Sequence, residues 1–213
     1  MATIIACVSQ KGGVGKSTLA RTFAVEAMKE GINTHIADLD IQQATSFEWS
    51  QRREDGGILP DISVATYGTA EAALLASEKY DLLIIDGPAR TSASTLEIAK
   101  IADLVIQPSG SSKDDLNPAI RAFHELTDHS ISKDKLLIAL CRVQSKKQIE
   151  IAKSYIKDAG YNVLSNGLQE KIGYQEALND GKALTETRYD KLNEESLLVM
   201  KELVQNLQII IDA

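Results

Sequence analysis

The chain has 213 residues, of which 44% are hydrophobic and 25% are charged, and its formal net charge is −7. This composition is ordinary for a globular protein, and the length allows one sizeable core. The negative charge argues against a uniformly basic nucleic-acid binder, although a local basic patch is still compatible with it.

Apolar runs of strand length alternate with segments of helical periodicity along most of the chain. The runs predict strands at residues 3–8, 34–37, 62–65, 81–85, 104–107 and 136–140. The periodic segments predict helices at residues 17–29, 41–53, 69–78, 92–100, 118–127, 147–157, 174–178 and 191–208. Apolar strands alternating with helices indicate a parallel sheet covered on both faces. We therefore expect a three-layer αβα fold with a mostly parallel, doubly wound sheet, whose ligands bind beyond the carboxyl ends of the strands.

A glycine-rich run, KGGVGKST, lies between the first predicted strand and the first predicted helix. Its backbone N–H groups and the helix N-terminus can hold phosphates, and its glycines allow a tight loop. In such a loop Lys16 reaches the β- and γ-phosphates, and the Ser17 hydroxyl binds Mg²⁺. The run predicts a P-loop for ATP and Mg²⁺, and the alternative is a turn that only caps the helix. The residues expected to bind the nucleotide are Lys11, Gly12, Gly13, Val14, Gly15, Lys16, Ser17 and Thr18.

Three aspartates lie where predicted strands end. Asp38 and Asp40 follow the second strand, and Asp86 follows the buried strand at 81–85. Because the carboxyl ends of parallel strands share one edge with the P-loop, this is where a magnesium-binding carboxylate and a water-orienting group belong. The alternatives are helix-capping roles for Asp38 and Asp40 and an ordinary turn position for Asp86.

The blocks KGGVGKST, ADLDIQQATSFEW and DLLIIDGPA together resemble the ParA/MinD family of deviant Walker ATPases, most of all its small ParA-type plasmid partition members. The resemblance implies a single P-loop ATPase domain over residues 1–213 that hydrolyses ATP to ADP and phosphate. It makes Lys11 the signature lysine, which crosses an ATP-dependent homodimer to the partner's phosphates, and Asp40 the water-positioning residue. The catalytic residues that it implies are Lys11, Lys16 and Asp40. The metal neighbours that it implies are Ser17, Asp38 and Asp86, the last as the Walker B aspartate.

Two more positions follow from the resemblance alone. Pro108 matches a position near a nucleotide-responsive loop, and Arg142 lies near a polar position that approaches adenine. Their alternatives are a strand terminator and a surface arginine at a strand end. The chain departs from the family at Ile41, where proline is usual, and at Gly87-Pro88-Ala89, where two prolines are frequent. These departures concern loop geometry rather than charged groups.

The resemblance also implies partners. ParA-type dimers bind DNA without sequence preference, which requires cations on phosphates rather than contacts with bases. The candidates are Lys146, Lys147, Lys153, Lys157, Lys171, Lys182 and Arg188, and the alternative for each is a solvated surface charge. A ParB-like adaptor that stimulates hydrolysis and a nucleoid-associated location are expected on the same ground.

Membrane and redox signals are weak. No apolar stretch approaches the ~20 residues that span a bilayer, and no signal peptide opens the chain. The terminal run LVMKELVQNLQIIIDA contains one cation, Lys201, so it fits a helix docked on the sheet better than a membrane-seeking helix, and we expect no membrane partner. Cys7 and Cys141 lie in apolar runs, which is typical of reduced thiols in a cytoplasmic protein.

Other functions stay open alongside partition of plasmid or chromosomal cargo. Related ATPases position carboxysomes or chemoreceptors, and a separate adaptor decides the cargo. A metabolic P-loop ligase of the dethiobiotin synthetase type would need substrate-binding residues that the sequence does not identify. An ATPase of the nitrogenase-reductase type would need cysteine ligands for an iron–sulfur cluster, and Cys7 lies inside a strand.

Overall fold

The computed structural model describes residues 2–89 and 92–211. Within this part of the chain, seven strands form a parallel sheet in the order β3-β2-β4-β1-β5-β6-β7, and β8 pairs in parallel with the end of β6. The predicted three-layer fold with a mostly parallel, doubly wound sheet is confirmed. The strands are β1 (Thr3–Cys7), β2 (Thr34–Asp38), β3 (Ser63–Thr66), β4 (Leu82–Asp86), β5 (Leu104–Ser109), β6 (Leu136–Val143), β7 (Asn162–Val163) and β8 (Leu168–Gln169).

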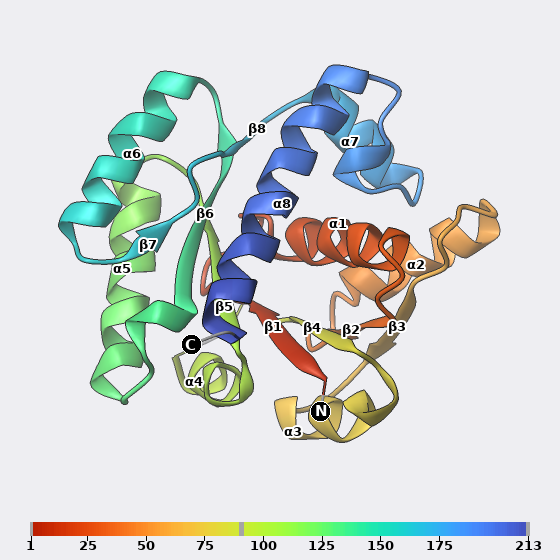
Figure 1. The fold of residues 1–213 in the computed structure, drawn as a ribbon, viewed down its shortest axis with the longest axis horizontal. Helices are drawn as coiled ribbons and strands as arrows, with labels where there is room; N and C mark the ends of the chain where they lie inside the picture. Colours follow the sequence, from red (N-terminus) through yellow and green to blue (C-terminus); the bar gives the residue numbers. More distant parts are fainter. Residues whose placement is uncertain (1, 90–91, 212–213) are drawn as a thin grey trace.

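Helices cover both faces of the sheet, and α8 crosses its front beside α1 (Figure 1). One core lies under α1 (Lys16–Lys29), α2 (Thr45–Asp55), α7 (Ile172–Asn179) and α8 (Asp190–Ile211). The other core lies under α3 (Ala70–Ala76), α4 (Ser92–Ile101), α5 (Lys113–Asp128) and α6 (Lys146–Asp158). Side chains of β1 alternate between them, because successive residues of a strand point to opposite faces: Ile5 packs in the first core and Ile4 in the second. None of the helices in the described residues is long and apolar enough to cross a membrane.

The strand order reverses around β1, which lies between β4 and β5. The register places Asp86 beside Cys7 of β1 on one side and beside Asp38 of β2 on the other. The last residues of three adjacent strands therefore meet at one point of the sheet edge. This is the topological switch point at which parallel α/β sheets bind ligands.

Some predicted boundaries were wrong. Helix α2 begins at Thr45 rather than at residue 41, because residues 41–44 form a turn in which Ala44 has φ 42°. Helix α5 begins five residues before Pro118, because the Ser112 hydroxyl caps it by accepting the Asp115 N–H at 3.2 Å. Strand β5 continues through Pro108 to Ser109, so this proline is not a strand terminator. Strands β7 and β8 were not predicted, because two residues are too few for periodicity to be detected.

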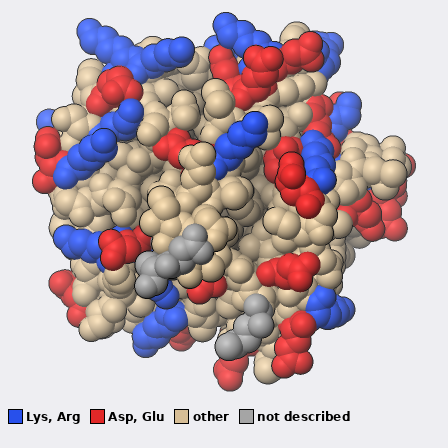
Figure 2. Space-filling model, viewed as in Figure 1, with Lys and Arg blue, Asp and Glu red and all other residues tan. Residues whose placement is uncertain are grey.

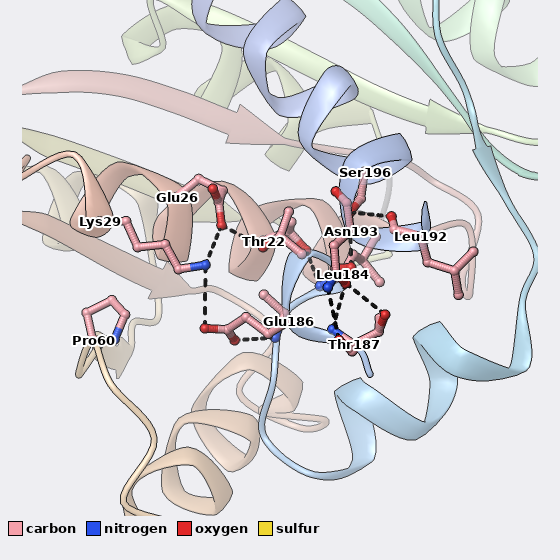
Figure 3. A network of polar contacts seen from close by, with 12 residues as sticks. Thr22, Glu26, Lys29, Pro60, Leu184, Glu186, Thr187, Leu192, Asn193 and Ser196 are labelled. Carbon is pink, nitrogen blue, oxygen red and sulfur yellow. Dashed lines mark hydrogen bonds and ion pairs between the residues drawn. The ribbon is translucent and has the colours of Figure 1, made fainter. Parts of the chain in front are cut away.

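Short 3₁₀ turns complete the fold at Ser77–Lys79, Lys133–Lys135 and Leu184–Glu186. The last of these, η3, matters for the site because it joins α7 to α8. The Leu184 N–H donates to Thr22 Oγ1 of α1 at 3.3 Å, and Ser196 Oγ of α8 donates to the Leu184 carbonyl at 3.0 Å (Figure 3). The η3 segment is therefore fixed to α1 and α8, two of the helices that cover this face of the sheet.

Candidate functional site

The loop between β1 and α1 has the backbone that a phosphate-binding loop requires. Gly13 and Gly15 have φ of 71° and 112°, in the region that favours glycine. A Cβ on Gly15 would also lie 3.4 Å from the Cys141 sulfur. No side chain caps the N-terminus of α1, so the N–H groups of its first turn are available to a ligand. The loop thus offers a preformed, positively polarised anion site.

Lys16 opens helix α1 and lies in this loop. Its Nζ is 3.5 Å from the Lys11 carbonyl oxygen, and its side chain is largely buried. Burial lowers the pKa of Lys16, while the nearby carboxylates of Asp86 and Asp40 oppose that shift. A cation held inside the loop in this way can meet an anionic ligand with little rearrangement.

Both carboxylate oxygens of Asp38 accept hydrogen bonds from backbone N–H groups. Its Oδ1 accepts the Asp40 N–H at 3.0 Å, and its Oδ2 accepts the N–H groups of Ser46 at 2.8 Å and Phe47 at 3.3 Å. These are contacts of a carboxylate that caps the start of α2. The residue at the N-cap position is Ala44, so Asp38 supports the first turn of α2 from outside the helix, and a role of Asp38 near a metal stays a prediction.

Asp86 ends β4 at the floor of the site and is 2% exposed. Its Oδ2 accepts the Ser46 hydroxyl at 2.6 Å, whereas its Oδ1 is buried without a partner. Burial raises the pKa of Asp86 to about 6, against the opposing influence of the Ser46 and Ser17 hydroxyls. A buried carboxylate oxygen without a donor is costly unless a cation or donor arrives.

The described residues contain no cluster of three or more His, Cys, Asp or Glu that could hold a metal alone. One carboxylate oxygen beside the Ser17 hydroxyl nevertheless fits Mg²⁺, which is usually bound by one or two carboxylates together with substrate phosphates. The residues that would hold it are therefore Ser17 and Asp86.

Asp40 lines the site from the turn before α2, where its Oδ1 accepts the Gln43 N–H at 3.3 Å. Lys11 lies in front of the loop, and its half-exposed ammonium is paired with Asp115 at the start of α5. Lys11 thus makes an ion pair within its own chain. A reach into a neighbouring molecule would require this pair to open.

The glycine-rich loop, Lys16, Asp40 and Asp86 border a cavity of about 430 Å³ that extends from the loop to α7. The far wall is built by β8, the following turn and α7, including Tyr174 and Leu178. The sequence did not reveal this wall, because its residues lie far along the chain from the P-loop and only packing brings the two together. Lys171, predicted as a DNA contact, also lines the cavity.

Arg142 joins the two sides of the cavity. Its Nη1 donates to the Gly13 carbonyl at 2.9 Å, and its Nη2 donates to Glu170 Oε1 at 2.8 Å. Its backbone lies in the left-handed region at φ 56°, within β6 rather than after it. Pro108 does not line the cavity and instead lies beneath Gly15, 3.9 Å from the position of a Cβ there.

The remaining DNA candidates fall into two groups. Helix α6 carries Lys146, Lys147, Lys153 and Lys157, and Lys153 pairs with Glu150 at 2.9 Å. Arg188 follows η3 and pairs with Glu176 at 3.2 Å, and the Lys182 carbonyl accepts the Trp49 indole N–H. Figure 2 shows Lys and Arg interspersed with Asp and Glu on the face it displays. The candidates therefore lie on two separate parts of the chain, α6 and the segment around η3.

Comparisons with known proteins agree with this geometry. A sequence profile of the CobQ/CobB/MinD/ParA nucleotide-binding domain matches residues 5–185. The septum site-determining protein MinD from Pyrococcus horikoshii, complexed with Mg-ADP, has 17% identity and a TM-score of 0.75, with 98% of each chain covered.

McdA from Cyanothece, in complex with ATP, has 21% identity and a TM-score of 0.69, covering 95% of this chain and 96% of that one. A ParA family ATPase from Chlorobium tepidum has 16% identity and a TM-score of 0.71, covering 95% and 99%. No curated protein sequence matches. With its P-loop at the sheet's switch point and 181 residues matched by the profile, the chain belongs to the CobQ/CobB/MinD/ParA family of nucleotide-binding domains.

Proposed function

We propose that this protein is a ParA-type ATPase switch. It binds ATP with Mg²⁺, dimerises, and in that state binds DNA without sequence preference to position or segregate plasmid or chromosomal cargo. A ParB-like adaptor stimulates hydrolysis, which ends the dimer and releases the protein from the nucleoid. The observation that carries the proposal is the P-loop with Lys11 in front of it and the unpartnered Asp86 oxygen at its floor.

Each residue of the site has a role that follows from its position. The free N–H groups of the first turn of α1 and the Lys16 ammonium hold the phosphates. Ser17 and Asp86 hold Mg²⁺, which supplies positive charge against the negative charge that develops on the phosphoryl oxygens. Asp40, on the turn beside the cavity, orients the attacking water. Lys11 adds a cation from the partner subunit after leaving Asp115.

The dimer compensates for a modest DNA surface. Each α6 places Lys146, Lys147 and Lys157 in exposed positions, and two copies double the number of phosphate contacts. Since the net charge is −7, we expect DNA binding to depend on the nucleotide-bound dimer rather than on overall charge.

The test is binding to DNA of arbitrary sequence with ATP, compared with ADP, over a range of salt concentrations. We expect binding with ATP only, with affinity that falls steeply as salt rises. Replacing Lys146, Lys147 and Lys157 by Ala should weaken binding and flatten the salt dependence, whereas Lys100→Ala on α4 should not. Absence of binding in every nucleotide state would refute the DNA-based switch while leaving ATP binding intact.

A different cargo is the second candidate. A positioning role for a carboxysome or chemoreceptor uses the same site, and the similarity to McdA is of the same order as that to the ParA family ATPase. Co-purification of the adaptor distinguishes these cargoes. The ligase alternative predicts turnover only with a second small-molecule substrate. The electron-transfer alternative is disfavoured because both thiols are buried, and burial raises the pKa of Cys7 and Cys141.

A further inference from the structure

A buried row of three side chains leads from the floor of the site into the protein. Arg21 Nε donates to Ser46 Oγ at 3.1 Å, and Ser46 Oγ donates to Asp86 Oδ2 at 2.6 Å. All three side chains are at least nine-tenths buried. Arg21 lies outside the motif blocks and lines the nucleotide cavity, and Ser46 lies within the block ADLDIQQATSFEW without a role assigned to it.

The direction of these hydrogen bonds is fixed by chemistry. A guanidinium can only donate, so the Ser46 oxygen must accept from Arg21. The hydroxyl has one hydrogen, and that hydrogen must therefore point to Asp86 Oδ2. The arrangement holds one oxygen of Asp86 on the protein and leaves the other, Oδ1, for a ligand from the cavity.

The position of Ser46 is itself determined from two sides. Its N–H is the cap contact of Asp38 at 2.8 Å, and its side chain lies at the first turn of α2. Arg21 is held from above by the Trp49 ring, 5.7 Å from the guanidinium carbon, while its Nη2 is buried without a partner. A buried charged group with an unpaired donor lowers the free energy of unfolding, and an apolar side chain could fill the same space without that cost.

We infer that Ser46 and Arg21 are positioning residues that orient the Asp86 carboxylate toward Mg²⁺. The inference rests on the proposed ATP–magnesium function and adds two residues to it. Ser46 also lies in the first turn of α2, which follows the Asp40 turn, so its hydroxyl links the cation site to the segment that carries the water-positioning residue.

The experiment measures the affinity of the nucleotide complex for Mg²⁺ rather than the rate of ATP hydrolysis. A fluorescent ATP analogue is bound to the protein without Mg²⁺ and then titrated with Mg²⁺, and the half-saturating Mg²⁺ concentration is compared among variants. Ser46→Ala should raise it by ~10-fold, the lower end of the loss seen when groups behind metal ligands are removed. Nucleotide affinity without Mg²⁺ should stay unchanged, and Ser46→Thr, which keeps the hydroxyl, should restore the wild-type value.

Matched controls lie on the same helix. Ser50 donates to the Phe47 carbonyl one turn further along α2, so Ser50→Ala removes a hydroxyl without touching Asp86. Arg21→Met should shift the Mg²⁺ titration in the same direction as Ser46→Ala, whereas Arg52→Met, at an exposed neighbouring position, should not. Should Ser46→Ala not fold, Arg21→Met and Arg21→Lys decide the question.

The results distinguish failure of the proposed function from failure of the positioning role of Ser46 and Arg21. If the wild-type protein binds the nucleotide with no effect of Mg²⁺, the proposed function is wrong. If Mg²⁺ tightens binding equally in the wild type, Ser46→Ala and Arg21→Met, the function stands and the positioning role is overturned. Equal losses of affinity with and without Mg²⁺ would also overturn it, because they indicate a general structural role.

Discussion

The Arg53–Glu186 pair allows a quantitative test of what holds the cavity wall in place. Arg53 of α2 is 1% exposed, and its two terminal nitrogens donate to the two Glu186 oxygens at 2.7 and 3.0 Å. Glu186 also accepts the Ala183 N–H at 2.8 Å and faces Lys29 at 3.7 Å (Figure 3). The pair therefore joins α2 to η3, whose Leu184 lines the nucleotide cavity.

Glu186→Ala should lower the free energy of unfolding by about 3–5 kcal/mol, because it leaves a buried arginine without its counter-charge. Arg53 keeps its bonds to the Pro60 and Gly181 carbonyls, which do not neutralise it. Replacing both partners, Arg53→Met with Glu186→Leu, should cost less than Glu186→Ala alone, since no buried charge is then unpaired.

Urea denaturation followed by circular dichroism measures these changes. The matched control is Glu176→Ala, which breaks the exposed pair with Arg188 and should cost at most about 1 kcal/mol. The reasoning fails if Glu186→Ala is no more destabilising than Glu176→Ala, or if the double variant is the least stable of the set.

Three further outcomes are expected. The pKa of Asp86 is about 6 in the folded protein and about 3.9 in the unfolded chain, so ionisation of Asp86 lowers the stability of the fold as pH rises between these values. Asp86→Asn should therefore become more stable relative to the wild type over that pH range in thermal melts without nucleotide. A stability difference that stays constant with pH would contradict this. Lys16→Ala should abolish nucleotide binding, while Asp40→Ala should trap ATP and the dimer in size-exclusion runs; wild-type turnover in Asp40→Ala would refute its role. Asp115→Ala frees Lys11 and should increase the dimer fraction at limiting ATP, by ~2–5-fold for a surface pair of up to about 1 kcal/mol; a smaller dimer fraction would exclude a restraining role.

The sequence predicted the parts of the site that are local in the chain. The P-loop follows from one continuous run, and the position of Asp86 follows from the apolar strand before it, because both signals occupy a few neighbouring residues. The boundary of α2 was harder, since the Asp38 contacts that start the helix involve N–H groups eight and nine residues away.

The parts that were missed depend on the packing of distant segments. Arg21 has the pattern of a surface residue on a helix, and only its contact with Ser46, 25 residues along the chain, shows why it is buried. The cavity wall around Tyr174 is brought to the P-loop by the sheet, as β8 pairs with β6. For Lys171 the sequence recorded a charge but not its place beside the cavity.

Trp49 gives this protein an internal optical reporter. It is the single tryptophan of the chain, it is fully buried in α2, and its indole N–H donates to the Lys182 carbonyl at 3.1 Å. The guanidinium carbons of Arg21 and Arg53 lie 5.7 and 5.5 Å from its ring, one linked to the cation site and the other to the cavity wall. Because nearby charges and solvent shift indole emission, any movement of α2 during the nucleotide cycle changes the intrinsic fluorescence, and the cycle can be followed in real time without a label.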